Sequence, residues 1–180
     1  STKCTLIKRD IELLKEIDKA AILPDDLKHT LARGVTLSVS ISTLNEDISN
    51  RLEPGAASPL RRLQLVKELK KEGFLVGVNA MPLLPFISDT EDELEKIIIA
   101  VKDSGADYIL AGGLTLFGNG TADSKILFYK FLERYYPLLL PQYQQLYRAN
   151  FYPPFFYQDK IKEKVQHLCN KYQIRNSILA

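Results

Sequence analysis

Polar side chains that are poor acids and bases occur at the ends of three predicted strands of this 180-residue chain. Ligands of α/β proteins bind at the carboxyl ends of parallel strands, so these positions are the first candidates for a site. The candidates are Ser40, Ser42 and Thr43 after the first strand, Asn79, Met81, Leu83 and Leu84 after the second, and Gly112, Gly113 and Thr115 after the third. Hydroxyl, amide and backbone groups donate and accept hydrogen bonds. The set therefore predicts binding of a polar ligand rather than acid–base catalysis.

Familiar catalytic motifs are absent from the sequence, which has no Ser/His/Asp grouping, HExxH, Walker loop or GxGxxG. His29 and His167 fall on predicted helices or turns away from the strand ends and are expected at the surface. Glu53 and Asp89 lie in predicted loops, where turn or capping roles are favoured. Glycines at 112–113 and 118–120 could hold a phosphate, although glycines after a strand are usually turn residues. The residues thus predict a ligand-binding scaffold without a visible catalytic group.

Alternating strand and helix patterns predict that a parallel α/β fold positions these residues. We expect strands over 35–43, 74–80 and 107–111, helices over 5–19, 59–72 and 91–104, and a loop over 45–59. Ser58 before Pro59 and the capping box from Thr90 to Glu93 mark two helix starts. An aromatic-rich helical segment, 124–147, and a terminal helix, 155–173, follow.

The strand at 35–43 alternates apolar and hydroxyl residues, whereas a parallel strand buried on both faces is apolar throughout. A β/α barrel combines the two patterns. Its helices would face Val35, Leu37, Val39 and Ile41, and its interior would face Thr36, Ser38, Ser40 and Ser42. The alternative is an antiparallel sheet with one wet face, which the strand alone would favour. The parallel pattern around the strand favours the barrel.

Composition is that of an ordinary globular protein, with 46% hydrophobic and 26% charged residues and a net charge of +2. This balance neither suggests nor excludes nucleic-acid binding. Two isolated cysteines, Cys4 and Cys169, fit a reducing compartment, and we expect a cytoplasmic protein. No apolar run reaches the roughly 18 residues of a membrane span, so no membrane partner is expected. Because the chain begins abruptly with Ser1, we expect it to be processed or truncated.

Several short motifs occur in order over residues 1–115. They are Ser1-Thr2-Lys3, Lys8-Arg9-Asp10, Val39-Ser40-Ile41-Ser42, Leu52-Glu53-Pro54 with Arg62 after it, Gly77-Val78-Asn79-Ala80-Met81-Pro82 and Ile87-Ser88-Asp89. The ordered set resembles the radical S-adenosylmethionine (SAM) enzymes, and within them the spore photoproduct lyase-like branch. The resemblance implies a partial (β/α)6 TIM-like barrel. Residues 1–120 would hold its last three β/α units, and 121–180 would form a helical C-terminal extension.

The resemblance also implies an activity and a site. The family uses a 4Fe–4S cluster to cleave SAM and generate a 5′-deoxyadenosyl radical, so the parent protein is expected to be a lyase-like radical SAM enzyme. The implied SAM-binding residues are Lys3, Ser40 and Met81, the last through its backbone against the adenine. Supporting residues would be Ser42, Asn79 and Arg62, with Arg62 bracing its loop against the barrel.

The sequence departs from the family at the cluster. Family members hold it with a CxxxCxxC motif, which is absent here, and cluster ligands are thiolates held in close groups. We therefore expect these 180 residues alone to bind no cluster and to catalyse no reaction.

Other functions remain open. A β/α-barrel lyase or aldolase without a cluster would need a lysine or paired carboxylates at strand ends, which the three strands do not offer. A non-enzymatic nucleic-acid-binding module could use basic and aromatic residues after 124, although such a stripe more often packs in a core or lid. DNA is a candidate substrate by family analogy only. An exposed strand edge would favour self-association.

Overall fold

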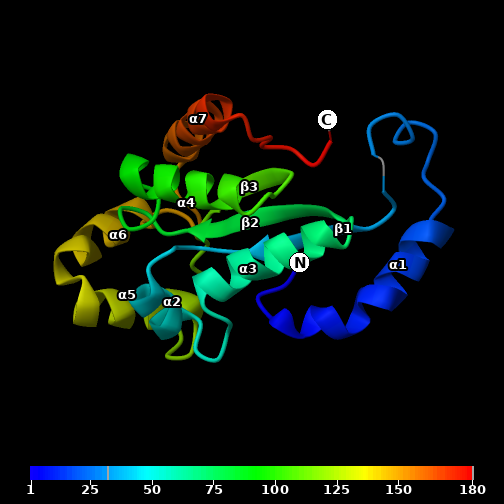
Figure 1. Ribbon diagram of the computed structural model, residues 1–180. Helices are drawn as coiled ribbons and strands as arrows, with labels where there is room; N and C mark the ends of the chain where they lie inside the picture. The colour runs from blue at the N-terminus through cyan, green and yellow to red at the C-terminus, as the bar shows by residue number, and fades with distance from the viewer. Residues whose placement is uncertain (32, 180) are drawn as a thin grey trace.

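The computed structural model describes residues 1–31 and 33–179, which form one parallel sheet with helices around it (Figure 1). Its strands are β1 (Thr36–Ser40), β2 (Leu75–Leu83) and β3 (Tyr108–Gly113), in the order β1-β2-β3. Ser40 lies beside Asn79, and Asn79 beside Leu110. The parallel register therefore brings the predicted strand-end residues to one edge of the sheet.

The predicted helices are present, with starts set by local hydrogen bonds. The Ser58 hydroxyl accepts from the Arg61 N–H at 3.4 Å, and the Thr90 hydroxyl accepts from the Glu93 N–H at 3.4 Å. The described helices are η1 (Thr5–Asp10), α1 (Ile11–Ala20), α2 (Glu46–Leu52), α3 (Pro59–Lys71), α4 (Glu91–Asp103), α5 (Ser124–Tyr135), η2 (Pro137–Leu139), α6 (Leu140–Leu146) and α7 (Phe155–Tyr172). Of those described, none combines the length and apolarity needed to cross a bilayer.

Helix α2 replaces part of the loop predicted over 45–59. The Asn45 side chain accepts from the Ile48 N–H at 3.0 Å, which satisfies one of the free donors of the first turn. The helix has seven residues, and only Ile48 and Ser49 are buried. So short a segment shows no repeated apolar spacing from which a helix could be predicted.

Helices α3 and α4 cover one face of the sheet. The core joins Leu37 and Val39 of β1, and Ile41 just after it, to Val66 and Leu69 of α3, and it continues through α4 to α7. Figure 1 shows α7 lying beside α4. The hydroxyl residues Ser38 and Ser40 alternate with these apolar positions and are only partly buried. The predicted alternation along this strand is therefore confirmed.

The predicted barrel is wrong. The described residues form an open sheet of three strands, to which Thr2 adds one bridge beside Val39 and Arg175 one bridge beside Tyr108. Three strands are too few to close, and the part of the chain that the structure describes contains no partial barrel of β/α units. The antiparallel alternative is wrong too, since both strand pairs are parallel. An alternating strand indicates only that one face of the sheet is apolar and the other polar. An open sheet with helices on one face produces this pattern as well as a barrel does.

A second core lies beyond the carboxyl ends of β2 and β3. It packs Leu84, Leu114 and Leu116 against Phe128 and Leu132 of α5, together with Tyr143 and Tyr147. Both tyrosines are fully buried, and their rings stack with centroids 5.9 Å apart. The aromatic residues of 124–147 therefore belong largely to a core, as their helical spacing favoured.

Replacing Gly77 with alanine is expected to destabilise the protein by about 1–3 kcal/mol, the usual effect of overpacking a filled site. A Cβ at Gly77 would stand 2.1 Å from a ring carbon of Tyr108, whose hydroxyl bonds to Ser38 at 2.8 Å. Urea denaturation measures the effect. The matched control is Gly113→Ala, because a Cβ there meets nothing within 4 Å. Equal stability of the two variants would contradict the expectation.

Candidate functional site

The sheet face opposite α3 and α4 carries a row of hydrogen-bonded polar side chains. Ser38 contacts the Tyr108 hydroxyl at 2.8 Å, and Ser40 contacts the Ser1 hydroxyl at 2.9 Å. The Asn79 amide nitrogen donates to the same Ser1 hydroxyl at 3.2 Å. The residues come from three strands and the N-terminal segment, so only the parallel register brings them together.

One atom in this row lacks a partner. Among the described residues, the buried amide oxygen of Asn79 is the one buried side-chain polar atom that receives no hydrogen bond. Leaving a buried acceptor unpaired costs about 1–3 kcal/mol, so native structures pair nearly all of them. A hydrogen-bond donor that reached this oxygen, beside Ser40, would therefore be favourable.

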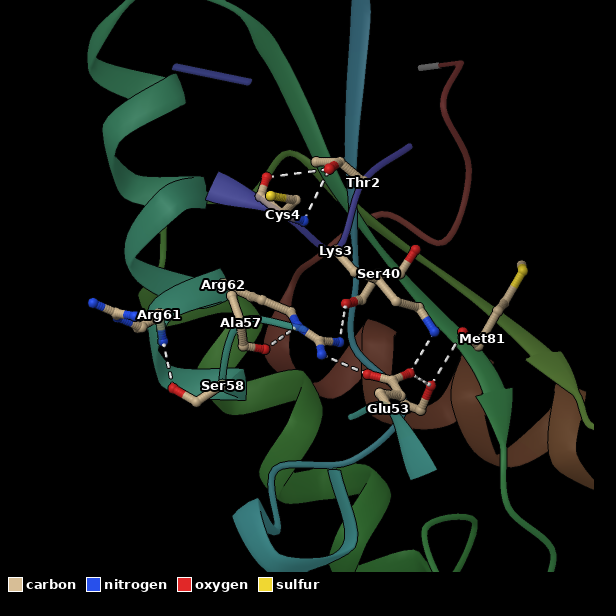
Figure 2. A network of polar contacts seen from close by, with 11 residues as sticks. Thr2, Lys3, Cys4, Ser40, Glu53, Ala57, Ser58, Arg61, Arg62 and Met81 are labelled. Atoms are coloured by element: carbon tan, nitrogen blue, oxygen red, sulfur yellow. Dashed lines mark hydrogen bonds and ion pairs between the residues drawn. The ribbon is translucent and has the colours of Figure 1, made fainter. Parts of the chain in front are cut away.

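A charged network lies next to this row, at the carboxyl end of β1 (Figure 2). The Glu53 carboxylate accepts from Lys3 through one oxygen and from Arg62, at 2.5 Å, through the other. The Arg62 guanidinium also donates to the Ala57 carbonyl at 2.6 Å and to the Ser40 carbonyl at 3.0 Å. Arg62, which is 1% exposed, thereby ties the loop before α3 to the end of β1. This contact set is what a bracing residue requires.

Glu53 is held ionised by its two cationic neighbours. Burial raises the pKa of this carboxyl, but hydrogen bonds from Lys3 and Arg62 and the attraction of both charges outweigh burial and bring the pKa below its ordinary value. The carboxylate in turn fixes the Lys3 ammonium, whose side chain stays 40% exposed. Lys3 can therefore meet a ligand while remaining paired.

Met81 and Ser42 complete this edge. The Ser42 hydroxyl lies 3.2 Å from the Met81 carbonyl and 3.4 Å from Glu53. The Met81 side chain covers Gly112, where a Cβ would stand 3.0 Å from the Met81 Cγ. Lys3, Ser42 and Glu53 also line a cavity of about 190 Å³. All six residues predicted for the site thus lie at one edge of the sheet. Ser1 joins Asn79 to Ser40 by hydrogen bonds. The Glu53 network connects the other predicted residues, namely Lys3, Ser42, Arg62 and Met81, and reaches Ser40 through Arg62.

Glu53 was missed as a site residue. Its backbone does end α2, as a turn role predicts, but its side chain joins the network. The available signal was Arg62 nine positions later, a spacing that no general rule connects with an ion pair. The histidines are where they were expected, since His29 and His167 are both exposed.

A second carboxylate, the buried Asp89, was also missed. It accepts from the Phe86 N–H at 2.6 Å, which is the predicted turn role, and from the Tyr157 hydroxyl at 2.6 Å. Burial raises the pKa of Asp89 above its ordinary value, although both hydrogen bonds act the other way. The pair borders a cavity of about 450 Å³ between α7 and the ends of β2 and β3, where Met81 also contributes.

The cysteines do not fit an iron–sulfur cluster. Cys4 is exposed before η1, whereas Cys169 is buried on α7, where burial raises the pKa of its thiol to about 11. A cluster needs several thiolates held close together. In residues 1–31 and 33–179, no three Cys, His, Asp or Glu side chains are grouped so that they could hold a metal ion.

Comparison with known proteins identifies relatives but no activity. No family model matches the chain. Uncharacterized proteins of Mycobacterium bovis and Mycobacterium tuberculosis are each 28% identical over 173 residues, which is 96% of this chain and 46% of the relative. An uncharacterized protein of Acidianus two-tailed virus is 31% identical over 111 residues, 60% of this chain and 32% of that protein. The chain spans about half the length of the mycobacterial relatives it matches.

Proposed function

We propose that the chain is the SAM-holding part of a radical SAM enzyme, with the adenosyl end of SAM bound along Ser40, Asn79 and Met81. The observation that carries the proposal is the unpaired amide oxygen of Asn79, buried beside the row that Ser40 and Ser1 form. SAM offers donors that would pair with it, namely the ribose hydroxyls and the adenine amino group. The motif resemblance supports the same ligand at the same residues.

Each side chain of the edge has a separate task in this proposal. Asn79 and Ser40 orient the nucleoside by hydrogen bonds, and the Met81 backbone lies against the adenine. The Lys3 ammonium faces the ligand's carboxylate, and Glu53 holds that ammonium in place. Arg62 acts at one remove, because it fixes Glu53 and the end of β1.

The role proposed for this chain stops at binding. SAM supplies a 5′-deoxyadenosyl radical when it is cleaved reductively at a cluster, and the two cysteines here do not fit such a cluster. Reductive cleavage would therefore depend on thiolates outside these residues. The chain covers 46% of its mycobacterial relatives, so a statement about the whole protein goes beyond these residues. As part of the same proposal, the whole protein is a cytoplasmic, lyase-like radical SAM enzyme.

Isothermal titration of the chain with SAM tests the proposal. We expect saturable binding, and we expect Asn79→Leu to weaken it about tenfold, which corresponds to the loss of one hydrogen bond of about 1.4 kcal/mol. Ser38→Ala is the matched control on the same face, because the Ser38 hydroxyl already bonds to Tyr108. Absence of binding by the folded chain, or equal affinities of the Asn79 variant and the parent, would refute the proposal.

A further inference from the structure

Two loops far apart in sequence present stacked aromatic rings to solvent. Phe117 follows β3 and Phe151 precedes α7, and their ring centroids lie 4.5 Å apart at an interplanar angle of 25°. Their exposed fractions are 52% and 46%. Tyr152 packs edge-on against Phe151 at 4.9 Å, and Phe155, which is 72% exposed, lies 6.1 Å from Tyr152. These four residues are called the aromatic surface below.

Hydrogen bonds hold the two loops in this arrangement. The Leu116 N–H donates to the Phe151 carbonyl at 2.7 Å, which ties one loop to the other. The Phe117 N–H donates to the Ser124 hydroxyl at 2.8 Å, at the start of α5. These hydrogen bonds hold the Phe117 and Phe151 rings in place although both rings are exposed. Exposed, preorganised rings of this kind leave apolar area in water that a flat ligand could cover.

Cationic groups adjoin the aromatic surface. A cavity of about 220 Å³ is lined by Phe151, Lys125 and Arg148, together with Asn119 and Asn150, and no Asp or Glu lines it. Neither cation takes part in the ion pairs found within residues 1–31 and 33–179. The nearby Asp123 accepts from the Gly120 N–H at 2.6 Å. An anionic ligand with a planar ring matches this combination of groups.

We propose that the aromatic surface binds single-stranded nucleic acid. Bases would extend the stack of Phe117 and Phe151, and phosphates would lie against Lys125 and Arg148. Sequence-tolerant binding of single strands combines these two features, rings for bases and cations for the backbone. The charge pattern favours nucleic acid over an apolar protein segment, which would leave the exposed Arg148 without an anionic partner. Lys125 lies 3.4 Å from the Tyr147 carbonyl and 5.9 Å from the Tyr129 ring centroid, and its charge has no carboxylate partner among the ion pairs of the described residues. The surface shares no residue with the proposed SAM site, so either proposal can fail without the other.

Fluorescence anisotropy with a labelled oligo(dT) of about 15 nucleotides measures the interaction. We expect affinity to fall steeply between about 50 and 200 mM NaCl, because phosphate contacts release counterions. Phe151→Leu and Phe117→Leu should each weaken binding about tenfold, within the range for loss of one stacked base. Arg148→Gln should reduce the slope of log affinity against log salt by about one.

Two control variants remove an exposed apolar side chain and an exposed cation elsewhere. Leu138→Ala removes an 86% exposed apolar side chain from η2, and Arg61→Gln removes an exposed guanidinium from α3, and both should bind as the parent does. No binding at low salt would overturn the proposal. So would binding that depends on Arg148 but not on either phenylalanine, since that describes a general polyanion surface. Preferential binding of anionic vesicles, lost with the same phenylalanine variants, would assign the surface to membranes instead.

Discussion

Arg62→Met is expected to lower the free energy of unfolding by about 3–5 kcal/mol, as removing one partner of a buried ion pair does. Methionine fills much of the same volume but pairs with none of the three oxygens that Arg62 contacts, on Ala57, Ser40 and Glu53. The Glu53 carboxylate would keep only Lys3 as a cationic partner. Urea denaturation followed by circular dichroism measures the loss.

The controls separate the ion pair from general sensitivity of α3. Arg61→Gln changes the exposed neighbour and should alter stability by less than about 0.5 kcal/mol. Adding Glu53→Gln to Arg62→Met removes the carboxylate charge that has lost its Arg62 partner. The double variant should therefore be more stable than Arg62→Met alone. A loss below about 1 kcal/mol for Arg62→Met would show that the network contributes little beyond an exposed pair.

The stability lost in Arg62→Met is expected to depend on pH. Because the pKa of Glu53 is lower in the folded protein than the ordinary 4.5, ionised Glu53 stabilises the fold. That contribution is complete above the ordinary value and disappears as pH falls below 4.5 through the folded-state pKa. Arg62→Met should therefore lose more stability at neutral pH than in acid. If the difference in unfolding free energy between the parent and Arg62→Met were the same at neutral pH and in acid, the assigned role of Glu53 would be contradicted.

Features that depend on neighbouring residues were predictable from the sequence. Ser58 and Thr90 start helices where their spacing indicated, and Leu37 and Val39 face the helices as their alternation required. The parallel order followed because strands and helices alternate along the chain. The capping and alternation signals each lie within a few residues, where side-chain chemistry and backbone geometry are directly coupled.

Features that depend on distant partners were not predictable. Closure of a sheet depends on how many strands meet, and the alternation at β1 carries no information about that number. Glu53 joins Lys3 from fifty positions away, and Asp89 joins Tyr157 from sixty-eight positions away. Neither pairing follows a local spacing rule, so both carboxylates looked like ordinary loop residues. Motif resemblance nominated Lys3, Ser40 and Met81, and only the folded register explains why Glu53 belongs with them.

Tyr143→Ala is the second change with a large expected effect, a loss of about 3–5 kcal/mol as for other large aromatic side chains removed from a core. Tyr143 is fully buried, packs against Phe86, Phe128 and Tyr147, and donates to the Pro85 carbonyl at 2.6 Å. Pro85 and Phe86 lie in the turn that also holds Asp89. Removing the ring should therefore loosen that turn as well as open a cavity, and thermal or urea denaturation measures the total.

Tyr143→Phe divides this effect into packing and hydrogen bonding. Phenylalanine keeps the ring contacts but leaves the Pro85 carbonyl without its donor, so the expected loss is about 1–3 kcal/mol. Leu138→Ala, at an 86% exposed position on η2, should change stability by less than about 0.5 kcal/mol. If Phe and Ala at 143 cost the same, the hydrogen bond to Pro85 would account for the whole effect. Since a ring in contact with three aromatic neighbours must contribute through packing, we expect the alanine variant to be clearly the less stable of the two.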